Sequence, residues 1–335
     1  MKLFGRLPLF DIIELAEQSE KVDFETREAN VIVIGANGFI GKWLSTYFLY
    51  MINQGLNSGS LTLITRDLIA PEILLPDFPS KSLVNVSSKN ISKESFLHLL
   101  DARTIVIFAA TSTSASGVSI NAFRNEGVEL ADKVMSNLPT KDNLLVHLSS
   151  GGIYEPSARK LFKIPKDYNL QKDSSDLYTQ EKINLEEWSR QKDIQEVFVA
   201  RNPRLFAFYG PGLPLDRHFA ISQFVTQARQ NKSILITGNP SNIRSYLHPV
   251  DLVLQIMGQC RTSDPVYSQI GSQNSISILE LANLVADIFK VKVEIDEDHL
   301  VEVNNYVPSD VPKIELKSLN LGIAQWNKWL EVSCP

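Results

Sequence analysis

Cysteine and histidine are scarce in this sequence. Among 335 residues there are two cysteines, Cys260 and Cys334, and five histidines. Two cysteines so far apart cannot build a disulfide framework, and the histidines lack the spacing of metal ligands. We therefore expect neither a structural disulfide nor a metal site.

An excess of positive charge is also missing, as are long apolar runs. The formal net charge is −5, whereas proteins that bind a phosphate backbone are usually basic. The uncharged stretch 104–121 is rich in serine and threonine and does not resemble a membrane span. The first ten residues lack the apolar core of a signal peptide. These features predict no nucleic-acid partner, no membrane association and a cytoplasmic location.

The sequence does contain short apolar runs that alternate with helical patterns. Its hydrophobic fraction of 44% and charged fraction of 21% are typical of a globular protein. Runs with the length of buried parallel strands are 31–34, 61–65, 104–108, 144–148 and 197–200. Helical patterns include 43–52, 126–135 and 178–190. This alternation predicts an α/β fold, with a Rossmann-type doubly wound parallel sheet and a smaller C-terminal substrate-binding lid.

The sequence suggests three parts of the chain. Residues 1–28 are expected to be an N-terminal extension containing a short amphipathic helix. Residues 29–207 form the expected dinucleotide-binding domain, and 208–335 are expected to be mainly substrate-binding, with about 248–272 returning to the Rossmann sheet. A predicted helix over 276–289 and a strand over 291–295 belong to the second domain.

A glycine turn, Gly35 to Gly41 with the spacing G-x-x-G-x-x-G, follows the first apolar run. Glycine permits a sharp turn and a close approach of the backbone to a pyrophosphate, and the N-terminus of the next helix favours the negative charge. Its position between a strand and a helix makes the motif more specific than its spacing alone. We expect the cofactor to contact Gly35, Asn37, Gly38, Phe39, Ile40 and Gly41.

The end of the second strand predicts which dinucleotide binds. An acidic residue there would hold the ribose hydroxyls of NAD. Thr65 occupies the expected position and is followed by Arg66, whose guanidinium suits the 2′-phosphate of NADP. Asp67 would serve NAD if the turn were shifted by one residue. NADP is therefore the expected cofactor, with NAD as the alternative.

Two Tyr-x-x-x-Lys matches compete for the catalytic role. Tyr168 and Lys172 lie in a polar, proline-containing stretch, whereas Tyr178 opens a helical pattern. On a helix, Lys182 would lie one turn from Tyr178, on the same face. A tyrosine acting as a base near neutral pH needs its pKa lowered from about 10 by roughly 3 units. We expect Lys182 and an oxidised nicotinamide to supply the positive charge for this.

A hydroxyl that orients the substrate oxygen would complete the site. Ser149 and Ser150 end the 144–148 run, and the carboxyl ends of strands carry the site in such sheets. Ser150 is the preferred candidate.

These motifs together resemble the extended short-chain dehydrogenase/reductase family, in its nucleotide-sugar epimerase/dehydratase group. The resemblance covers 30 to about 325 and rests on the glycine turn, the segments 149–154, 206–212 and 244–251, and the Tyr178/Lys182 pair. It implies that Ser150 is the catalytic hydroxyl, that Arg244 binds the nucleotide diphosphate and that Asp251 frames that region. It further implies cofactor contacts from Ala109, Ala110 and Phe206, and substrate contacts from Ser150, Ala207, Asp216, His218, Phe219 and Arg244. For Asp216 and His218 a role in loop packing stays open.

Departures from the family pattern narrow the expected reaction. Dehydratases of the family follow the catalytic hydroxyl with Asp-Glu, where this chain has Gly151 and Gly152, so dehydration is disfavoured. Ala207 replaces a common asparagine. The preferred hypothesis is 4-keto reduction of a nucleotide-diphosphate 4-keto-6-deoxysugar for surface-polysaccharide synthesis. The alternatives are a 4-epimerase with retained NAD and a non-catalytic NAD(P)-binding regulatory protein. The resemblance also implies a homodimer, whose interface is formed by the helix over 126–135 and the helix that carries Tyr178.

Overall fold

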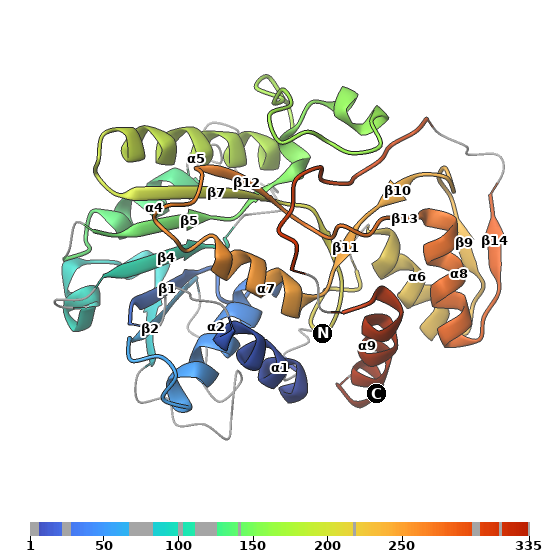
Figure 1. The fold of residues 1–335 in the computed structure, drawn as a ribbon, viewed down its shortest axis with the longest axis horizontal. Coiled ribbons are helices and arrows are strands. Elements are labelled where there is room, and N and C mark those ends of the chain that lie inside the picture. Colours follow the sequence, from blue (N-terminus) through green and yellow to red (C-terminus); the bar gives the residue numbers. More distant parts are fainter. Residues whose placement is uncertain are drawn as a thin grey trace.

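A computed structural model describes residues 7–21, 28–66, 83–99, 103–110, 126–139, 142–216, 219–296, 302–314 and 317–333. Its larger lobe is built on a parallel sheet with the order β12-β7-β5-β4-β1-β2-β3, and β6 pairs with β7 (Figure 1). The strands are β1 (Asn30–Ile34), β2 (Leu61–Thr65), β3 (Leu83–Ser87), β4 (Thr104–Phe108), β5 (Leu144–His147), β6 (Ser149–Ser150), β7 (Val199–Leu205) and β12 (Tyr267–Ile270).

Helices cover both faces of this sheet because the strand side chains alternate between two apolar clusters. Val31 and Val33 pack with α2 (Phe39–Asn53) and α7 (Pro249–Gly258) on one face. Ile32 and Ile34 pack with α4 (Glu126–Met135) and α5 (Leu177–Ile194) on the other. Strands buried on both faces need apolar residues at every position, as the sequence has. The predicted doubly wound α/β fold is confirmed.

The strand after α5 differs from the prediction. It was expected over 197–200, but β7 runs over Val199–Leu205, and Val197 is 48% exposed. The apolar pattern missed its second half because that half carries buried polar residues with specific partners. Asn202 accepts or donates hydrogen bonds with His147 and Ser189 at 2.9–3.1 Å.

The N-terminal helix α1 (Leu9–Glu20) packs on α2 and α7, and its Ile12 and Leu15 are fully buried. It is also fixed by charge, since the ammonium of Lys317 lies 2.9 Å from Asp11 and 2.6 Å from Glu14. Burial raises the pKa of Asp11 to about 6, although Lys317 counteracts this rise. α1 is therefore an integral part of the core on this face of the sheet.

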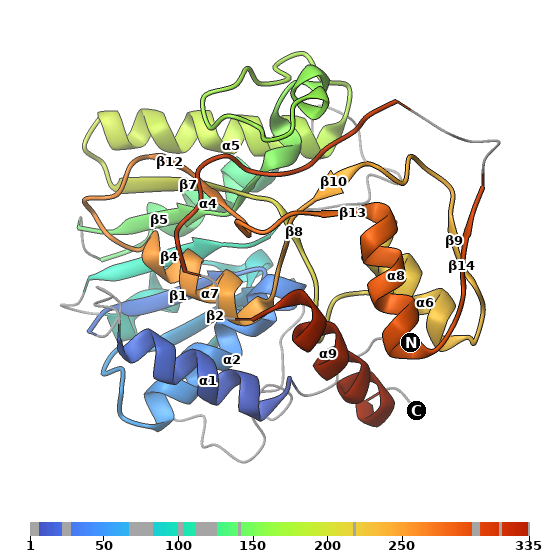
Figure 2. The same cartoon turned by 45° about the vertical axis from the view of Figure 1, so that its right-hand side comes forward.

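The smaller lobe has an apolar core of its own. Figure 2 shows this lobe beside the sheet. Its larger elements are α6 (Ala220–Arg229), α8 (Ile278–Phe289), α9 (Leu319–Ser333), β9 (Ile234–Ile236) and β14 (Val293–Ile295). Two short pairs are β8 (Ala207–Phe208) with β11 (Tyr246–Leu247), and β10 (Ile243–Arg244) with β13 (Ile276–Ser277). The helix expected from residue 276 begins at Ile278, because Ser277 caps it in a capping box with Glu280.

None of the helices in the described part of the chain combines the length and the hydropathy that crossing a membrane requires.

Candidate active site

The glycine turn lies between β1 and α2, at the carboxyl edge of the sheet. Gly35 has φ +85°, and a Cβ on it would lie 2.7 Å from the backbone nitrogen of Ala110. A Cβ on Gly41 would overlap the carbonyl oxygen of Gly35. Gly38 is the N-cap of α2 and is exposed, as is Asn37. This cradle, which side chains would fill, fits the pyrophosphate of a dinucleotide at a helix N-terminus.

The other predicted cofactor residues surround this turn. Thr65 is buried at the end of β2, and Arg66 is exposed directly after it. Ala109 and Ala110 follow β4, where the backbone of Ala110 closes against Gly35. Asp67 lies outside the described residues.

Two of the predicted cofactor side chains on α2 also serve packing. The ring of Phe39 stacks on Phe208 of the smaller lobe, with centroids 5.2 Å apart and 13° between the planes. Ile40 is half-buried against the core below. Phe208 therefore occupies one face of the Phe39 ring.

The three predicted catalytic residues come together at the end of β6. The hydroxyl of Ser150 accepts a hydrogen bond from the Gly152 nitrogen at 3.0 Å, at the start of the short 3₁₀ helix η4 (Gly151–Ile153). Asp176 caps α5 by accepting from Thr179 at 2.9 Å, which places Tyr178 in the first turn. Tyr178 interacts with Ser150 through a side-chain hydrogen bond.

Lys182 lies one turn along α5 from Tyr178. Its ammonium is 5.9 Å from the centroid of the Tyr178 ring and donates to the Leu148 carbonyl at 2.6 Å. Burial lowers the pKa of Lys182 to about 8.

The pKa of Tyr178 differs from the expectation. It is raised to about 12, chiefly by burial, and the hydrogen bond to Ser150 only partly counteracts this. Lys182 is expected from the sequence to lower this pKa, but the loss of hydration outweighs any such effect in the protein itself. The Tyr178 hydroxyl therefore keeps its proton at neutral pH.

The competing tyrosine and lysine pair is not on a helix. Tyr168 and Lys172 lie in the segment between η5 (Pro156–Lys160) and α5. The Tyr168 hydroxyl donates to Ser157 at 3.1 Å, and Lys172 is exposed. This arrangement favours Tyr178 as the reactive tyrosine.

A buried ion pair that the sequence did not reveal fixes α5 on the sheet. Two nitrogens of Arg204 on β7 donate to the carboxylate of Glu186 at 3.0 and 2.8 Å. The Arg204 guanidinium also stacks over Tyr154, 5.0 Å from its centroid. Such a paired and stacked arginine orients the helix that carries Tyr178 and Lys182.

Both lobes contribute to the surroundings of Arg244, a predicted substrate residue. Arg244 on β10 donates to the carbonyls of Ile243, at 3.0 Å, and Asn304. Near it lies Arg159, which sequence reasoning missed, with its guanidinium carbon 3.9 Å from the centroid of the Tyr306 ring. Burial lowers the pKa of Arg244, and the neighbouring charge of Arg159 lowers it further. The two arginines form a positive site beside Tyr306.

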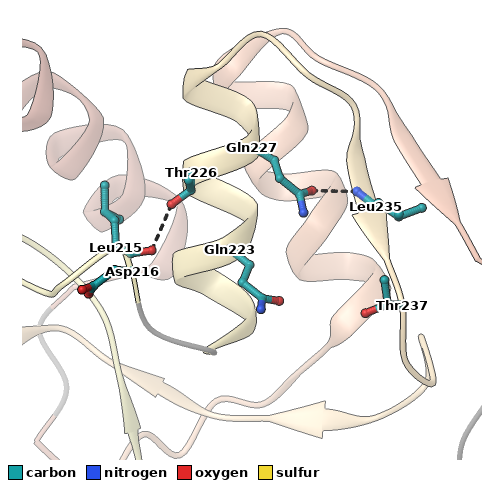
Figure 3. Close-up of a pocket in the computed structure, with 7 residues that line it drawn as sticks. All are labelled: Leu215, Asp216, Gln223, Thr226, Gln227, Leu235 and Thr237. Atoms are coloured by element: carbon teal, nitrogen blue, oxygen red, sulfur yellow. Dashed lines mark hydrogen bonds between the residues drawn. The ribbon is translucent and has the colours of Figure 1, made fainter.

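A cavity of about 310 Å³ lies farther out on the smaller lobe (Figure 3). Of the predicted substrate residues, Asp216 lines it. Phe219, the N-cap of α6, is 53% exposed. The remaining lining residues are Leu215, Gln223, Thr226, Gln227, Leu235 and Thr237.

The other predicted substrate residues are spread more widely. Ala207 is half-buried on β8, and Phe206 is buried before it with its ring 4.6 Å from that of Tyr306. Asp251 is fully buried in α7 and accepts a hydrogen bond from the backbone nitrogen of Lys317 at 3.3 Å. His218 lies outside the described residues.

Comparison with known proteins gives consistent matches. Residues 31–258 match the model of the NAD dependent epimerase/dehydratase family. UDP-glucuronic acid decarboxylase 5 of Arabidopsis thaliana is 27% identical over 109 residues, which is 32% of this chain and 31% of that protein. The chain therefore matches about a third of the length of this curated relative.

Solved structures resemble almost the whole chain. UDP-N-acetylglucosamine 4-epimerase of Methanobrevibacter ruminantium, in complex with UDP-N-acetylmuramic acid, has a TM-score of 0.71 and 16% identity, covering 91% of this chain and 99% of its own. UDP-glucuronic acid 4-epimerase of Bacillus cereus, in complex with UDP-glucuronic acid and NAD, has a TM-score of 0.70 and 15% identity, covering 90% and 99%. At such identities these structures support the fold, and the family model covers most of the chain. The chain belongs to the NAD dependent epimerase/dehydratase family.

Proposed function

We propose that this protein is an NAD(P)-dependent enzyme that transfers hydride at C4 of a nucleotide-diphosphate sugar. The observation that carries the proposal is the meeting of Ser150, Tyr178 and Lys182 at the carboxyl edge of the parallel sheet that also carries the glycine turn. Hydroxyl, tyrosine and lysine at a dinucleotide cradle are suited to the exchange of a proton and a hydride.

Each residue has a distinct role in this proposal. The backbone of the Gly35–Gly41 turn holds the pyrophosphate, and Arg66 and Thr65 face the adenosine end. The bound nicotinamide supplies or accepts the hydride. Ser150 donates a hydrogen bond to the oxygen on C4, and Tyr178 gives a proton to that oxygen or takes it away. Lys182 holds positive charge beside the tyrosine.

The first form of the reaction is reduction of a 4-keto-6-deoxysugar with NADPH, in the synthesis of surface-polysaccharide sugars. Exposed Arg66 supports NADP, since a guanidinium binds a phosphate well. The high pKa of Tyr178, about 12, supports a tyrosine that donates its proton. Gly151 and Gly152 offer no carboxylate for dehydration.

The second form is 4-epimerisation with retained NAD. It is supported by structural neighbours solved in complex with NAD and a UDP sugar, including the UDP-glucuronic acid 4-epimerase of Bacillus cereus. The same Ser150 and Tyr178 would then act first in removal and later in return of the hydride.

Cofactor identity separates the two forms. Denaturing the purified protein and analysing released nucleotides should give no trapped NAD if the first form holds. In titrations, Arg66→Ala should then weaken NADPH binding about tenfold or more and NADH binding much less, because one charge-assisted contact to the 2′-phosphate is lost. Lys93→Ala, which removes another exposed positive charge, serves as the control. Near-stoichiometric NAD, or equal losses for both nucleotides, would contradict the NADP form and favour the second.

We also propose a homodimer formed through α4 and α5. Half-buried Leu130 and Trp188 lie on these helices, among exposed residues of opposite charge such as Lys133 on α4 and Glu187 on α5. An interface so rich in charge should weaken as salt rises. Light scattering at micromolar concentration should give the mass of a dimer at low salt, and a monomer under these conditions would contradict the proposal.

A further inference from the structure

Arg159 and Arg244 are two like charges beside Tyr306. Both are half-buried, and the charge of Arg159 lowers the pKa of Arg244. Within the described ranges, no carboxylate lies at ion-pair distance from either guanidinium. The adjacent Lys160 does pair, with Glu302 at 3.7 Å. An uncompensated pair of this kind is suited to an anion supplied by a ligand.

Arg159 lies close to the reacting end of the site. Ser150 is the register partner of Leu205, whose carbonyl accepts a hydrogen bond from the Tyr306 hydroxyl at 3.2 Å. Arg159 stacks on that same Tyr306 ring at 3.9 Å. One aromatic ring therefore separates the Arg159 guanidinium from the strand position of the catalytic hydroxyl.

The backbone holds Arg159 in this place. Its carbonyl accepts a hydrogen bond from Asn305 at 2.7 Å, and Ile164 pairs with Pro308 farther along. In Figures 1 and 2 the dark red segment 302–314 runs back from the smaller lobe toward the larger one. Arg244 on β10 lies beside the same ring, because its backbone forms a β-bridge with that of Tyr306.

The shape of a pyranose assigns different anions to the two arginines. C1, which carries the diphosphate, is opposite C4 in the ring, whereas C5 and its substituent C6 are next to C4. The resemblance to the family implies that Arg244 binds the nucleotide diphosphate. Arg159, near Ser150, is placed for an anionic group next to the reacting carbon.

We infer that the substrate is a nucleotide-diphosphate hexuronic acid, whose C6 carboxylate is bound by Arg159. This inference rests on the proposed function, since it takes C4 as the reacting carbon. A 6-deoxysugar would place a methyl group beside the guanidinium. A carboxylate therefore favours the epimerase form over reduction of a 4-keto-6-deoxysugar.

The test compares an acidic and a neutral sugar on the holoenzyme. Binding of UDP-glucuronic acid and UDP-glucose, and of their dTDP counterparts, is measured by calorimetry. The wild type should bind the glucuronic acid form at least about tenfold more tightly, as expected of a charge-assisted contact. Arg159→Gln should remove most of this preference, and Arg159→Lys should retain part of it.

Lys160→Gln is the matched control, because it removes the same charge from the same turn but from an exposed ion pair. It should leave the preference for the acidic sugar as in the wild type. The inference would be overturned, while the proposed function stands, if the wild type bound the acidic and neutral sugars with nearly equal affinity. Equal losses of affinity for both sugars in Arg159→Gln would overturn it in the same way. Failure of every sugar nucleotide to bind would count against the inference and the proposed function together. If Arg159→Gln does not fold, the inference is judged from the ratio of the affinities for the acidic and neutral sugars in the wild type and in Arg159→Lys.

Discussion

Replacing Tyr178 with phenylalanine is expected to lower kcat by about 10³-fold, because the proton on C4 oxygen then has no donor or acceptor. The change removes a single hydroxyl whose partner is Ser150, so α5 and the glycine turn should stay in place. The measurement is the steady-state rate with the sugar nucleotide that binds, beside a titration of the nicotinamide cofactor. Cofactor affinity should change little.

The matched control is Tyr168→Phe, in the other Tyr-x-x-x-Lys pair. Its hydroxyl donates only to Ser157, so the loss should leave kcat within a few-fold of the wild type. Equal effects of the two substitutions would contradict the role of Tyr178. Full function of Tyr178→Phe would favour the non-catalytic, nucleotide-binding alternative.

Lys317→Met should lower the free energy of unfolding by about 3–5 kcal/mol, because it leaves buried carboxylates without their cation. The Lys317 side chain is 3% exposed, and it pairs with fully buried Asp11 as well as Glu14. Burial opposes its charge, but the hydrogen bonds to Glu14 and Asp11 raise the pKa of Lys317. The pair therefore attaches α1 to the segment before α9.

Urea unfolding followed by circular dichroism measures this effect. Lys328→Met on α9 removes an exposed charge and should change the free energy by no more than about 0.5 kcal/mol. A loss below about 1 kcal/mol for Lys317→Met would show that α1 is held by its apolar face alone. That face, with Ile12 and Leu15 in the core, would then be the anchor.

Apolar runs and glycines predicted the elements whose conformation depends on local sequence. The helix expected over 126–135 coincides with α4, and the runs at 31–34 and 61–65 became β1 and β2. Strands buried on both faces need no long-range information to be recognised. The glycine turn was equally visible, since its residues are constrained by backbone geometry at Gly35 and Gly41.

Features that depend on distant partners were not visible in the sequence. The second half of β7 looked unlike a strand because Asn202 and Arg204 are polar, and their partners His147 and Glu186 lie far away in the chain. Arg159 looked like one more surface charge until the fold placed it on Tyr306. No spacing rule could have found the contact of Arg159 with Tyr306, because 146 residues lie between them in the sequence.

The pKa of Tyr178 shows the same limit in electrostatics. Proximity in sequence predicted Lys182 beside the tyrosine, and the structure places its ammonium 5.9 Å from the ring centroid. Proximity could not predict the burial that raises the tyrosine pKa to about 12. In the oxidising direction, the positive charge needed to lower this pKa must then come largely from the bound nicotinamide.

Hydride transfer at C4 is tested most directly by following deuterium between sugar and nicotinamide. A nucleotide sugar deuterated at C4 is mixed with the oxidised holoenzyme in a single turnover, and the cofactor is analysed by mass spectrometry. We predict deuterium on the nicotinamide ring with the wild type. Samples are quenched throughout the turnover, because the epimerase form returns the label to C4 at its end. Turnover of the sugar with no deuterium on the nicotinamide at any time, or loss of the label to solvent, would contradict hydride transfer at C4.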